Sequence, residues 1–323
     1  MEATRVELDT LLEARDRLRG QVHLTPLLPA TLLGRQAEVR LWLKCENLQK
    51  TGSFKVRGVL NKLLGLGPEE RARGVVTVSA GNHAQALAWG ARAAGVPCTV
   101  VMPADASPTK AAASRAYGAE VVLHGDVFAA FARARALAEE RGLTFVHPFD
   151  DPAIVAGHAS AGLEILEQLR PPPDAVVVPV GGGGLIAGIA SAVKLRRPDL
   201  RVYGVEPEGA AAMYRSLEER RPVRLDEIST IADGLAPPMA GELPYDIVRR
   251  LVEEIVLVTD AEIARAMREI LAWAKLLAEP AGAAGVAALL AGRLSLENGT
   301  RVVCVLSGGN VDPGELGAIP GFC

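Results

Sequence analysis

Short apolar runs alternate with stretches of helical length along most of this chain. Val75-Val76 and Val121-Val122 lie in near-continuous apolar runs, which are typical of strands buried on both faces. Strand and helix follow one another with short turns, so the pattern predicts an α/β fold of parallel sheets covered by helices. In the middle of the chain, the predicted strands are 74–78, 97–102, 119–123 and 144–146, and the predicted helices are 84–94, 108–117 and 127–141.

The flanking segments carry the same alternation in longer units. The Pro171-Pro172-Pro173 run is interpreted as a stiff loop inside one lobe, because the next strand starts at once. Residues 221–245 are rich in Pro and Gly and are predicted to be irregular. The predicted strands here are 41–43, 175–180, 202–206, 255–258 and 302–306, and the predicted helices are 6–19, 53–64, 152–169, 184–195, 209–220, 260–277 and 280–290.

Length and charge narrow the class of protein. A chain of 323 residues suits two α/β lobes or one large one. The net charge of -3 gives no sign of a nucleic-acid surface, and no apolar run approaches the roughly 20 residues needed to span a bilayer. The N-terminus lacks the pattern of a signal peptide. The four cysteines, Cys45, Cys98, Cys304 and Cys323, lie far apart, so we expect a reduced, cytoplasmic protein without a cysteine metal site.

One lysine lies at a predicted strand-to-helix junction. The turn Thr51-Gly52-Ser53 offers a good N-cap, which places Lys55 in the first turn of the next helix. The positive end of the helix dipole disfavours an ammonium there, so Lys55 is a candidate nucleophile or base. Taken alone, it is more readily a solvated lysine on an amphipathic helix.

A run of four glycines follows the strand at 175–180. Gly181, Gly182, Gly183 and Gly184 allow successive backbone N–H groups to converge on an anion at a helix start. The spacing matches neither the dinucleotide-binding Gly-x-Gly-x-x-Gly pattern nor a Walker loop. A flexible turn is the alternative, but four adjacent glycines are costly in conformational entropy.

Two further loops carry polar groups at predicted strand ends. Ser79-Ala80-Gly81-Asn82-His83 places a hydroxyl, an amide and an imidazole at a helix start, where a carboxylate can bind. Ser307-Gly308-Gly309-Asn310 offers one hydroxyl flanked by glycines. With Lys55 and the glycine run, these parts favour a phosphate-bearing cofactor beside a lysine, and pyridoxal 5'-phosphate is the economical candidate.

From His23-Leu24-Thr25-Pro26 to Ser307-Gly308-Gly309-Asn310, the chain resembles the threonine and serine dehydratases (ammonia-lyases) and serine racemases, which are tryptophan synthase β-like, fold type II enzymes. The resemblance implies that Lys55 is the Schiff-base lysine and that Phe54 packs beside the cofactor ring. Other positions that match the cofactor site are Asn82, Gly181, Gly182, Gly183, Gly184, Leu185, Gly234, Glu279 and Ser307, and those that match the substrate-carboxylate loop are Ser79, Asn82 and His83.

Three positions depart from the family pattern. Ala80 stands where serine racemases have a serine that acts as acid and base, which favours elimination over racemisation. The family's site for Mg²⁺ or Ca²⁺ would use Glu206 with the Ala210 carbonyl, but its second carboxylate position matches Ala212, so the site is incomplete. Gly157-His158-Ala159-Ser160 replaces the more usual Gly-Gln-Gly-Thr.

The resemblance implies a two-lobed fold, each lobe a mostly parallel sheet flanked by helices. We expect residues 1–73 and 151–323 to form a large cofactor-binding domain and 74–150 a small mobile domain. The implied reaction is α,β-elimination of L-threonine, or L-serine, to 2-oxobutyrate or pyruvate and ammonia, with a small amino acid as substrate and a homo-oligomer as the assembly. Serine or aspartate racemase, 3-hydroxyaspartate dehydratase, a β-replacement synthase and a binding protein without chemistry are the alternatives.

Overall fold

The computed structural model describes residues 7–317 and 319. The described residues do not include 1–6, so the first residue of the helix predicted at 6–19 and most of the segment that was compared with a signal peptide lie outside them. Cys323 also lies outside them. Within residues 7–317, Cys45, Cys98 and Cys304 are free thiols. No helix in this part of the chain is both long and apolar enough to cross a bilayer.

A four-stranded parallel sheet forms from the middle of the chain, in the order β5 (Glu120–Leu123), β4 (Cys98–Met102), β3 (Val75–Val78), β6 (Thr144–Phe145). The valines of the central strands β3 and β4 are buried because helices cover both faces. Val121 and Val122, which were expected to be buried on both faces, are only half-buried because β5 lies at the edge of the sheet. One face packs against α7 (Val127–Arg141) through Val76 and Val101. The other packs against α5 (Asn82–Ala94) and α6 (Pro108–Ala116) through Val100 and Met102.

A six-stranded sheet forms from the flanking segments, in the order β1 (Leu27–Pro29), β2 (Arg40–Cys45), β10 (Arg301–Leu306), β7 (Ala175–Pro179), β8 (Arg201–Pro207), β9 (Glu254–Val258). Only β1 pairs in the antiparallel direction. One face carries α2 (Thr31–Gln36), α12 (Asp260–Glu269) and α13 (Pro280–Leu290), and the other carries α8 (Pro152–Gln168), α9 (Gly184–Arg196) and α11 (Glu242–Leu251). The α/β prediction is therefore confirmed.

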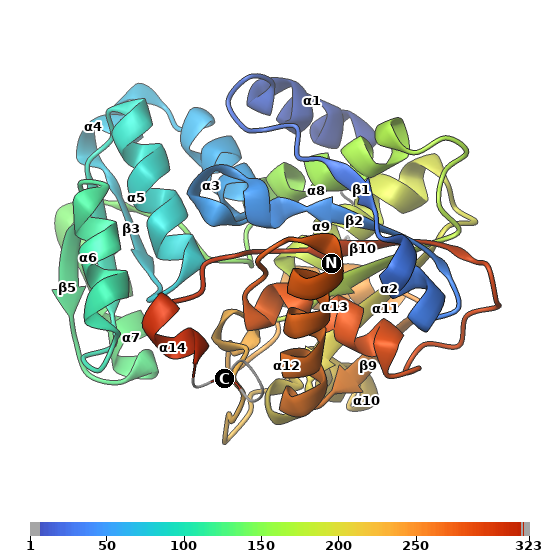
Figure 1. The fold of residues 1–323 in the computed structure, drawn as a ribbon. Helices are drawn as coiled ribbons and strands as arrows, with labels where there is room; N and C mark the ends of the chain where they lie inside the picture. The colour runs from blue at the N-terminus through green and yellow to red at the C-terminus, as the bar shows by residue number, and fades with distance from the viewer. Residues whose placement is uncertain (1–6, 318, 320–323) are drawn as a thin grey trace.

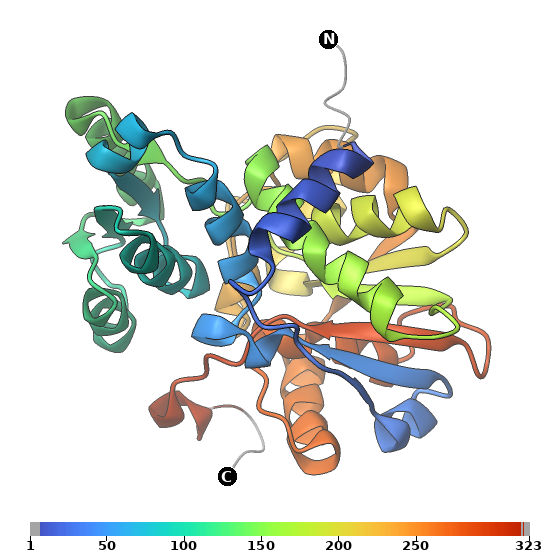
Figure 2. The same ribbon diagram turned by 90° about the horizontal axis from the view of Figure 1, so that it is seen from above.

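The helix α3 (Lys55–Leu64) lies where the two sheets meet. It packs against α8 on the side of the large sheet and against α5 on the side of the small one. Figures 1 and 2 show the two sheets with their helices as separate layers, with α3 between them. The helix α1 (Leu8–Leu18) lies across α8.

Several short helices were not predicted. The pattern missed α2, α4 (Pro68–Arg73) and α11, and it merged α10 (Ala212–Glu218) with the 3₁₀ turn before it. The predicted helix 260–277 ends its regular part at Glu269 and passes through a wide turn to Lys275, which has φ +59°. A last short helix, α14, spans Pro313–Leu316. Proline in the first turn of α4 and α11 explains the omission, because a first-turn proline is compatible with a helix.

The predicted cap of α3 is wrong. Phe54 is the N-cap residue and its side chain accepts no hydrogen bond. Thr51 has φ +60°, and the buried Ser53 hydroxyl has no hydrogen-bond partner. Ser53 instead pairs with Gly308 as an isolated β-bridge, so tertiary pairing with the end of β10 replaces the local cap. The placement of Lys55 in the first turn is confirmed.

Candidate active site

The end of strand β10 is joined directly to the lysine-bearing turn. The Phe54 backbone N–H donates to the Ser307 carbonyl at 3.1 Å, and the Gly309 N–H donates to the Gly52 carbonyl at 2.9 Å. Two segments from opposite ends of the chain therefore lie side by side. Lys55 and the Ser307 hydroxyl, which were singled out separately from the sequence, belong to one site.

Lys55 is partly buried in this site. Its Nζ donates to the Pro148 carbonyl at 2.9 Å and lies 5.1 Å from the centre of the Phe54 ring. Burial lowers the pKa of Lys55 to about 8, against an opposing attraction from Glu279. A lysine with this pKa is largely unprotonated just above that pH, which makes it a competent amine nucleophile or base.

The segment at the start of α5 is joined to the large lobe at Glu279 and Asn310. Asn82 Nδ2 donates to Glu279 Oε1 at 2.6 Å, and Asn310 Nδ2 donates to Asn82 Oδ1 at 2.8 Å. Burial raises the pKa of Glu279 to about 8. The Ser79 hydroxyl accepts the Gly81 N–H at 3.1 Å, which closes the loop on itself.

His83 is buried against the segment that follows β6. Its ring is buried, and Nε2 lies 3.4 Å from the Val146 carbonyl. Burial, followed by the charge of Lys55, lowers the pKa of His83 well below its ordinary value. A neutral imidazole at this point contributes packing and polarity, and no fixed positive charge for a carboxylate.

The glycine run has no room for side chains. A Cβ on Gly182 would lie 2.3 Å from the Phe149 ring, and Gly183 has φ +90° with Met213 Cε 2.5 Å from the position of a Cβ. Gly183 caps α9, whose first residues are Gly184 and Leu185, so the N–H groups of that first turn face the loop. This is a cradle of the kind that holds a phosphate group.

Two further predicted residues close the site around the glycine run. A Cβ on Gly181 would lie 3.4 Å from the Gly234 carbonyl, and one on Gly234 would lie 3.8 Å from Glu279 Oε1. The Phe54 ring meets the buried His158 ring edge-on, with centroids 4.7 Å apart. The predicted cofactor residues are thus brought together, and they fit an aldehyde-bearing, phosphate-bearing ring: an amine, an anion cradle and a neutral hydroxyl.

The predicted cation site does not fit a cation. Both oxygens of the buried Glu206 are taken by backbone N–H groups, from Met213 at 2.9 Å and from Tyr214 at 2.7 Å. Ala212 supplies only a methyl group, and Ala210 lies in the 3₁₀ turn before it. In the described part of the chain, no three His, Cys, Asp or Glu side chains gather as a metal site would require.

Two contributors were missed from the sequence. The Pro148 carbonyl that accepts a hydrogen bond from Lys55 could not be predicted from the sequence pattern, since its position depends on the path of the loop between β6 and α8. Arg57, which is fully buried two residues after Lys55, could have been found from the sequence. Glu164 interrupts the apolar helix α8, and a buried acid needs a positively charged partner.

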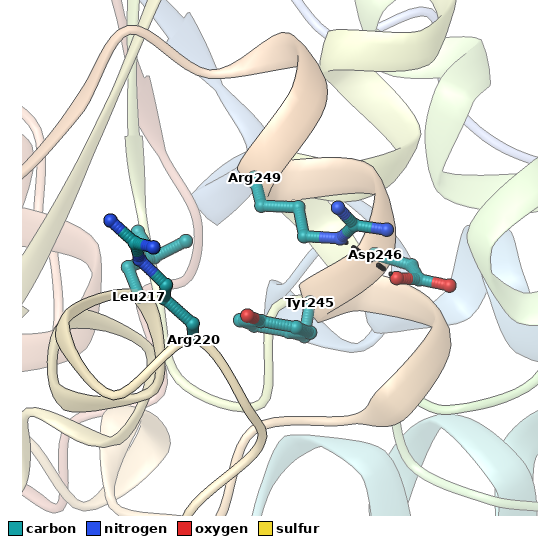
Figure 3. A pocket seen from close by; sticks show the side chains of 5 residues that line it. All are labelled: Leu217, Arg220, Tyr245, Asp246 and Arg249. Atoms are coloured by element: carbon teal, nitrogen blue, oxygen red, sulfur yellow. Dashed lines mark hydrogen bonds and ion pairs between the residues drawn. The ribbon is translucent and has the colours of Figure 1, made fainter.

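A separate hollow lies on the large lobe, next to α10 and α11. It is lined by Leu217, Arg220, Tyr245, Asp246 and Arg249 (Figure 3). Arg249 Nε donates to Asp246 Oδ1 at 2.9 Å within α11, so this charge pair is already satisfied. None of the predicted site residues lines it, and the chemistry described above belongs to the junction of the two lobes.

The chain is similar to known enzymes over most of its length. Residues 18–308 match the family model described as pyridoxal-phosphate dependent enzyme. The L-threonine ammonia-lyase of Thermotoga maritima is 45% identical over 308 residues, which are 95% of this chain and 76% of that protein.

Solved structures give the same result. A threonine deaminase from T.th. superposes with a TM-score of 0.90 at 44% identity, covering 95% of this chain and 99% of that one. Maize serine racemase superposes with a TM-score of 0.93 at 34% identity, covering 97% and 96%. The matched region contains Lys55, the glycine run and Ser307, and the chain belongs to the family of pyridoxal-phosphate-dependent enzymes.

Proposed function

We propose that this chain is an L-threonine ammonia-lyase, which converts L-threonine to 2-oxobutyrate and ammonia, with L-serine as a second substrate yielding pyruvate. The observation that carries the proposal is Lys55, an amine of lowered pKa set beside Ser307 and within one site with the glycine run. The identity of 45% to the L-threonine ammonia-lyase of Thermotoga maritima supports the choice of substrate.

Each predicted residue has a defined part in this proposal. Lys55 binds the cofactor covalently between turnovers. Ser79, Asn82 and His83 form the loop for the substrate carboxylate, with backbone N–H groups at the start of α5 as the anion donors. Phe54 would pack on the cofactor ring and Ser307 would meet its nitrogen. The remaining contacts would come from Gly181, Gly182, Gly183, Gly184, Leu185, Gly234 and Glu279.

The reaction is a proton removal followed by loss of water. Pyridoxal phosphate, when bound, supplies a sink for the electron pair left at Cα. The Lys55 amine would take the α-proton at Nζ, and the β-hydroxyl would leave with one proton, so that the α-hydrogen and the hydroxyl are lost together as one molecule of water. The released enamine is hydrolysed to the 2-oxo acid and ammonia. Ser307 would offer a neutral hydroxyl to the nitrogen of the cofactor ring, and a neutral partner at that position would favour elimination over racemisation.

A substrate panel tests the proposal directly. L-Thr, L-Ser, D-Ser and 3-hydroxyaspartate are incubated with the enzyme, with and without Mg²⁺, and both 2-oxo acid and product chirality are measured. We expect the highest oxo-acid rate with L-Thr. Lys55→Ala should abolish the absorbance of the lysine-bound cofactor and lower the rate by about 10²–10⁴-fold. Persistence of both in that variant would overturn the proposal.

Serine or aspartate racemase is the second candidate, because maize serine racemase and a pyridoxal phosphate-dependent aspartate racemase have the same fold at 34% and 36% identity. Ala80 favours elimination, since a methyl group cannot carry a proton on the far face of the substrate. In Ala80→Ser, we expect D-serine formation to rise relative to pyruvate formation. An unchanged ratio would remove this argument against racemisation.

The domain limits also belong to the proposal. We take 74–150, which contains the four-stranded sheet, as a small mobile domain, and 1–73 with 151–323 as the large one. Closure of the small domain would exclude water from the site between them. A homo-oligomeric assembly and a cytoplasmic setting stay predictions.

A further inference from the structure

Four charged side chains are buried together behind the lysine-bearing turn. Lys44 lies on β2, Glu46 follows that strand, Arg57 lies on α3 and Glu164 lies on α8. Lys44, Glu46 and Arg57 have no exposed surface, and Glu164 is 8% exposed. The group holds two positive and two negative charges, so its sum is neutral, as burial requires.

Arg57 is the centre of this group. Its Nε and Nη2 donate to the two oxygens of Glu46 at 2.7 and 2.8 Å, which is a bidentate fork. Its Nη1 and Nη2 donate to the two oxygens of Glu164 at 2.6 and 2.8 Å. The Ser160 hydroxyl accepts a further bond from Nη1 at 3.0 Å.

These contacts hold together the three elements that meet under the site. Glu46 belongs to the segment after β2, and Glu164 and Ser160 belong to α8, so Arg57 ties the first turn of α3 to both. Burial alone would raise the pKa of Glu46, but Arg57 lowers it overall, so the acid stays charged and the fork stays intact.

The first turn of α3 needs such support. The helix has no side-chain N-cap, and the Ser53 hydroxyl before it has no partner. Lys55 is the first residue of α3 and Arg57 the third, so a shift of the arginine moves the lysine with the same turn. Misplacement of a reacting group by about 1 Å can cost about a hundredfold in rate.

We propose that Arg57 is a positioning residue, whose fork onto Glu46 and Glu164 fixes the first turn of α3 and so places the Lys55 amine for bond formation with the cofactor aldehyde. This inference rests on the proposed role of Lys55 as the cofactor lysine. The bond forms with loss of water: the Lys55 nitrogen attacks the aldehyde carbon, and the carbonyl oxygen leaves as water.

Lys44 provides a matched control. It belongs to the same buried group, but its amine donates to Glu164, to Gln168 and to the Thr25 carbonyl, none of which lies on α3. Lys44→Met and Arg57→Lys each disturb the buried charges. Only the arginine substitution also releases the turn that carries Lys55.

The experiment measures covalent capture of the cofactor at residue 55. Apoprotein of each variant is mixed with pyridoxal phosphate, the adduct is trapped with borohydride at timed intervals, and mass spectrometry locates it. We expect Arg57→Lys to slow trapping at Lys55 by roughly tenfold or more, and Lys44→Met to leave it within about twofold at a comparable loss of Tm. In turnover, kcat should fall in Arg57→Lys while KM stays within about threefold.

A structural role alone would give a different result. If the trapping rates of the natural protein, Arg57→Lys and Lys44→Met all fall on one line against Tm, Arg57 is not a positioning residue. Should Arg57→Lys fail to fold, Glu46→Gln keeps the shape of one fork partner and removes its charge, and unchanged trapping in it would also overturn the proposal. Absence of any adduct at Lys55 in the natural protein would instead refute the proposed function.

Discussion

At the scale of single residues, burial is the main cause of the lowered pKa of Lys55. The sequence predicted a lowered pKa from the helix dipole, whereas the structure attributes the lowering to about 8 to burial first, with Glu279 acting in the opposite direction. Both routes favour the neutral amine. The tertiary contribution was out of reach of the sequence, because Pro148 and Glu279 come from distant segments.

The pKa of Lys55 can be measured in the apoprotein. Its amine should react with trinitrobenzenesulfonate with a midpoint near pH 8, because only the unprotonated amine reacts and burial lowers its pKa. In Glu279→Gln the midpoint should fall further, since removal of a carboxylate takes away attraction for the ammonium. Lys55→Ala should lack the fast-reacting site. A midpoint near that of an ordinary lysine would contradict the assignment.

At the scale of elements, the sequence predicted helices and strands most accurately where the period of the apolar residues agreed with the positions of flanking turn residues. The helices predicted at 127–141 and 280–290 are α7 and α13 with those bounds, and each predicted strand is present to within one or two residues. The cap of α3 failed because Ser53 pairs with Gly308, near the other end of the chain. Helix α11 was missed because its first residues belong to the Pro- and Gly-rich stretch 221–245. Its packing against α9 stabilises it as a helix.

The connection between β8 and α10 gives an element-scale prediction. Because Glu206 accepts the Met213 and Tyr214 N–H groups, millimolar Mg²⁺ or Ca²⁺ should leave the Tm of the natural protein unchanged. Ala212→Asp sets a second carboxylate beside Glu206. We expect its Tm to fall and to recover with Ca²⁺, which should stabilise the variant by about 1.4 kcal/mol at a concentration of about ten times Kd.

Ala212→Asn is the control for this experiment, since it has the same shape without the charge. Its Tm should not respond to Ca²⁺. A saturable rise in the Tm of the natural protein with either cation would show that the Glu206 carboxylate leaves its backbone partners to bind metal, against this prediction.

At the scale of the whole molecule, the segment 221–241 of the large lobe reaches the small one. The Arg224 guanidinium lies 3.6 Å from the centre of the Phe128 ring on α7, and Asp233 pairs with Lys110 on α6. These contacts cross the junction that contains Lys55. In the proposed function, in which the small lobe closes over the site, these contacts would hold the two lobes together.

Loss of Arg224 should therefore weaken closure. An exposed cation–π contact contributes about 0.5–1 kcal/mol, so Arg224→Ala should raise KM for L-threonine by about two- to fivefold. Arg221→Ala, which removes an exposed ion pair to Glu219 within the same segment, should change it little. A double-mutant cycle with Phe128→Leu measures the coupling, and additive effects of the two substitutions would refute the contact as a closure device.

The sequence by itself determined the α/β class, most strands and long helices, and the loops that carry the candidate chemistry, because these depend on local period, on glycine and on helix starts. Tertiary structure decided which loops meet, the partners of Lys55, the cap of Glu206 on α10, and the buried group around Arg57. The Glu206 cap joins residues seven and eight positions apart, whereas the other features depend on pairing between residues more distant in the chain. In all of them, burial removes water and makes an unpaired charge or N–H costly.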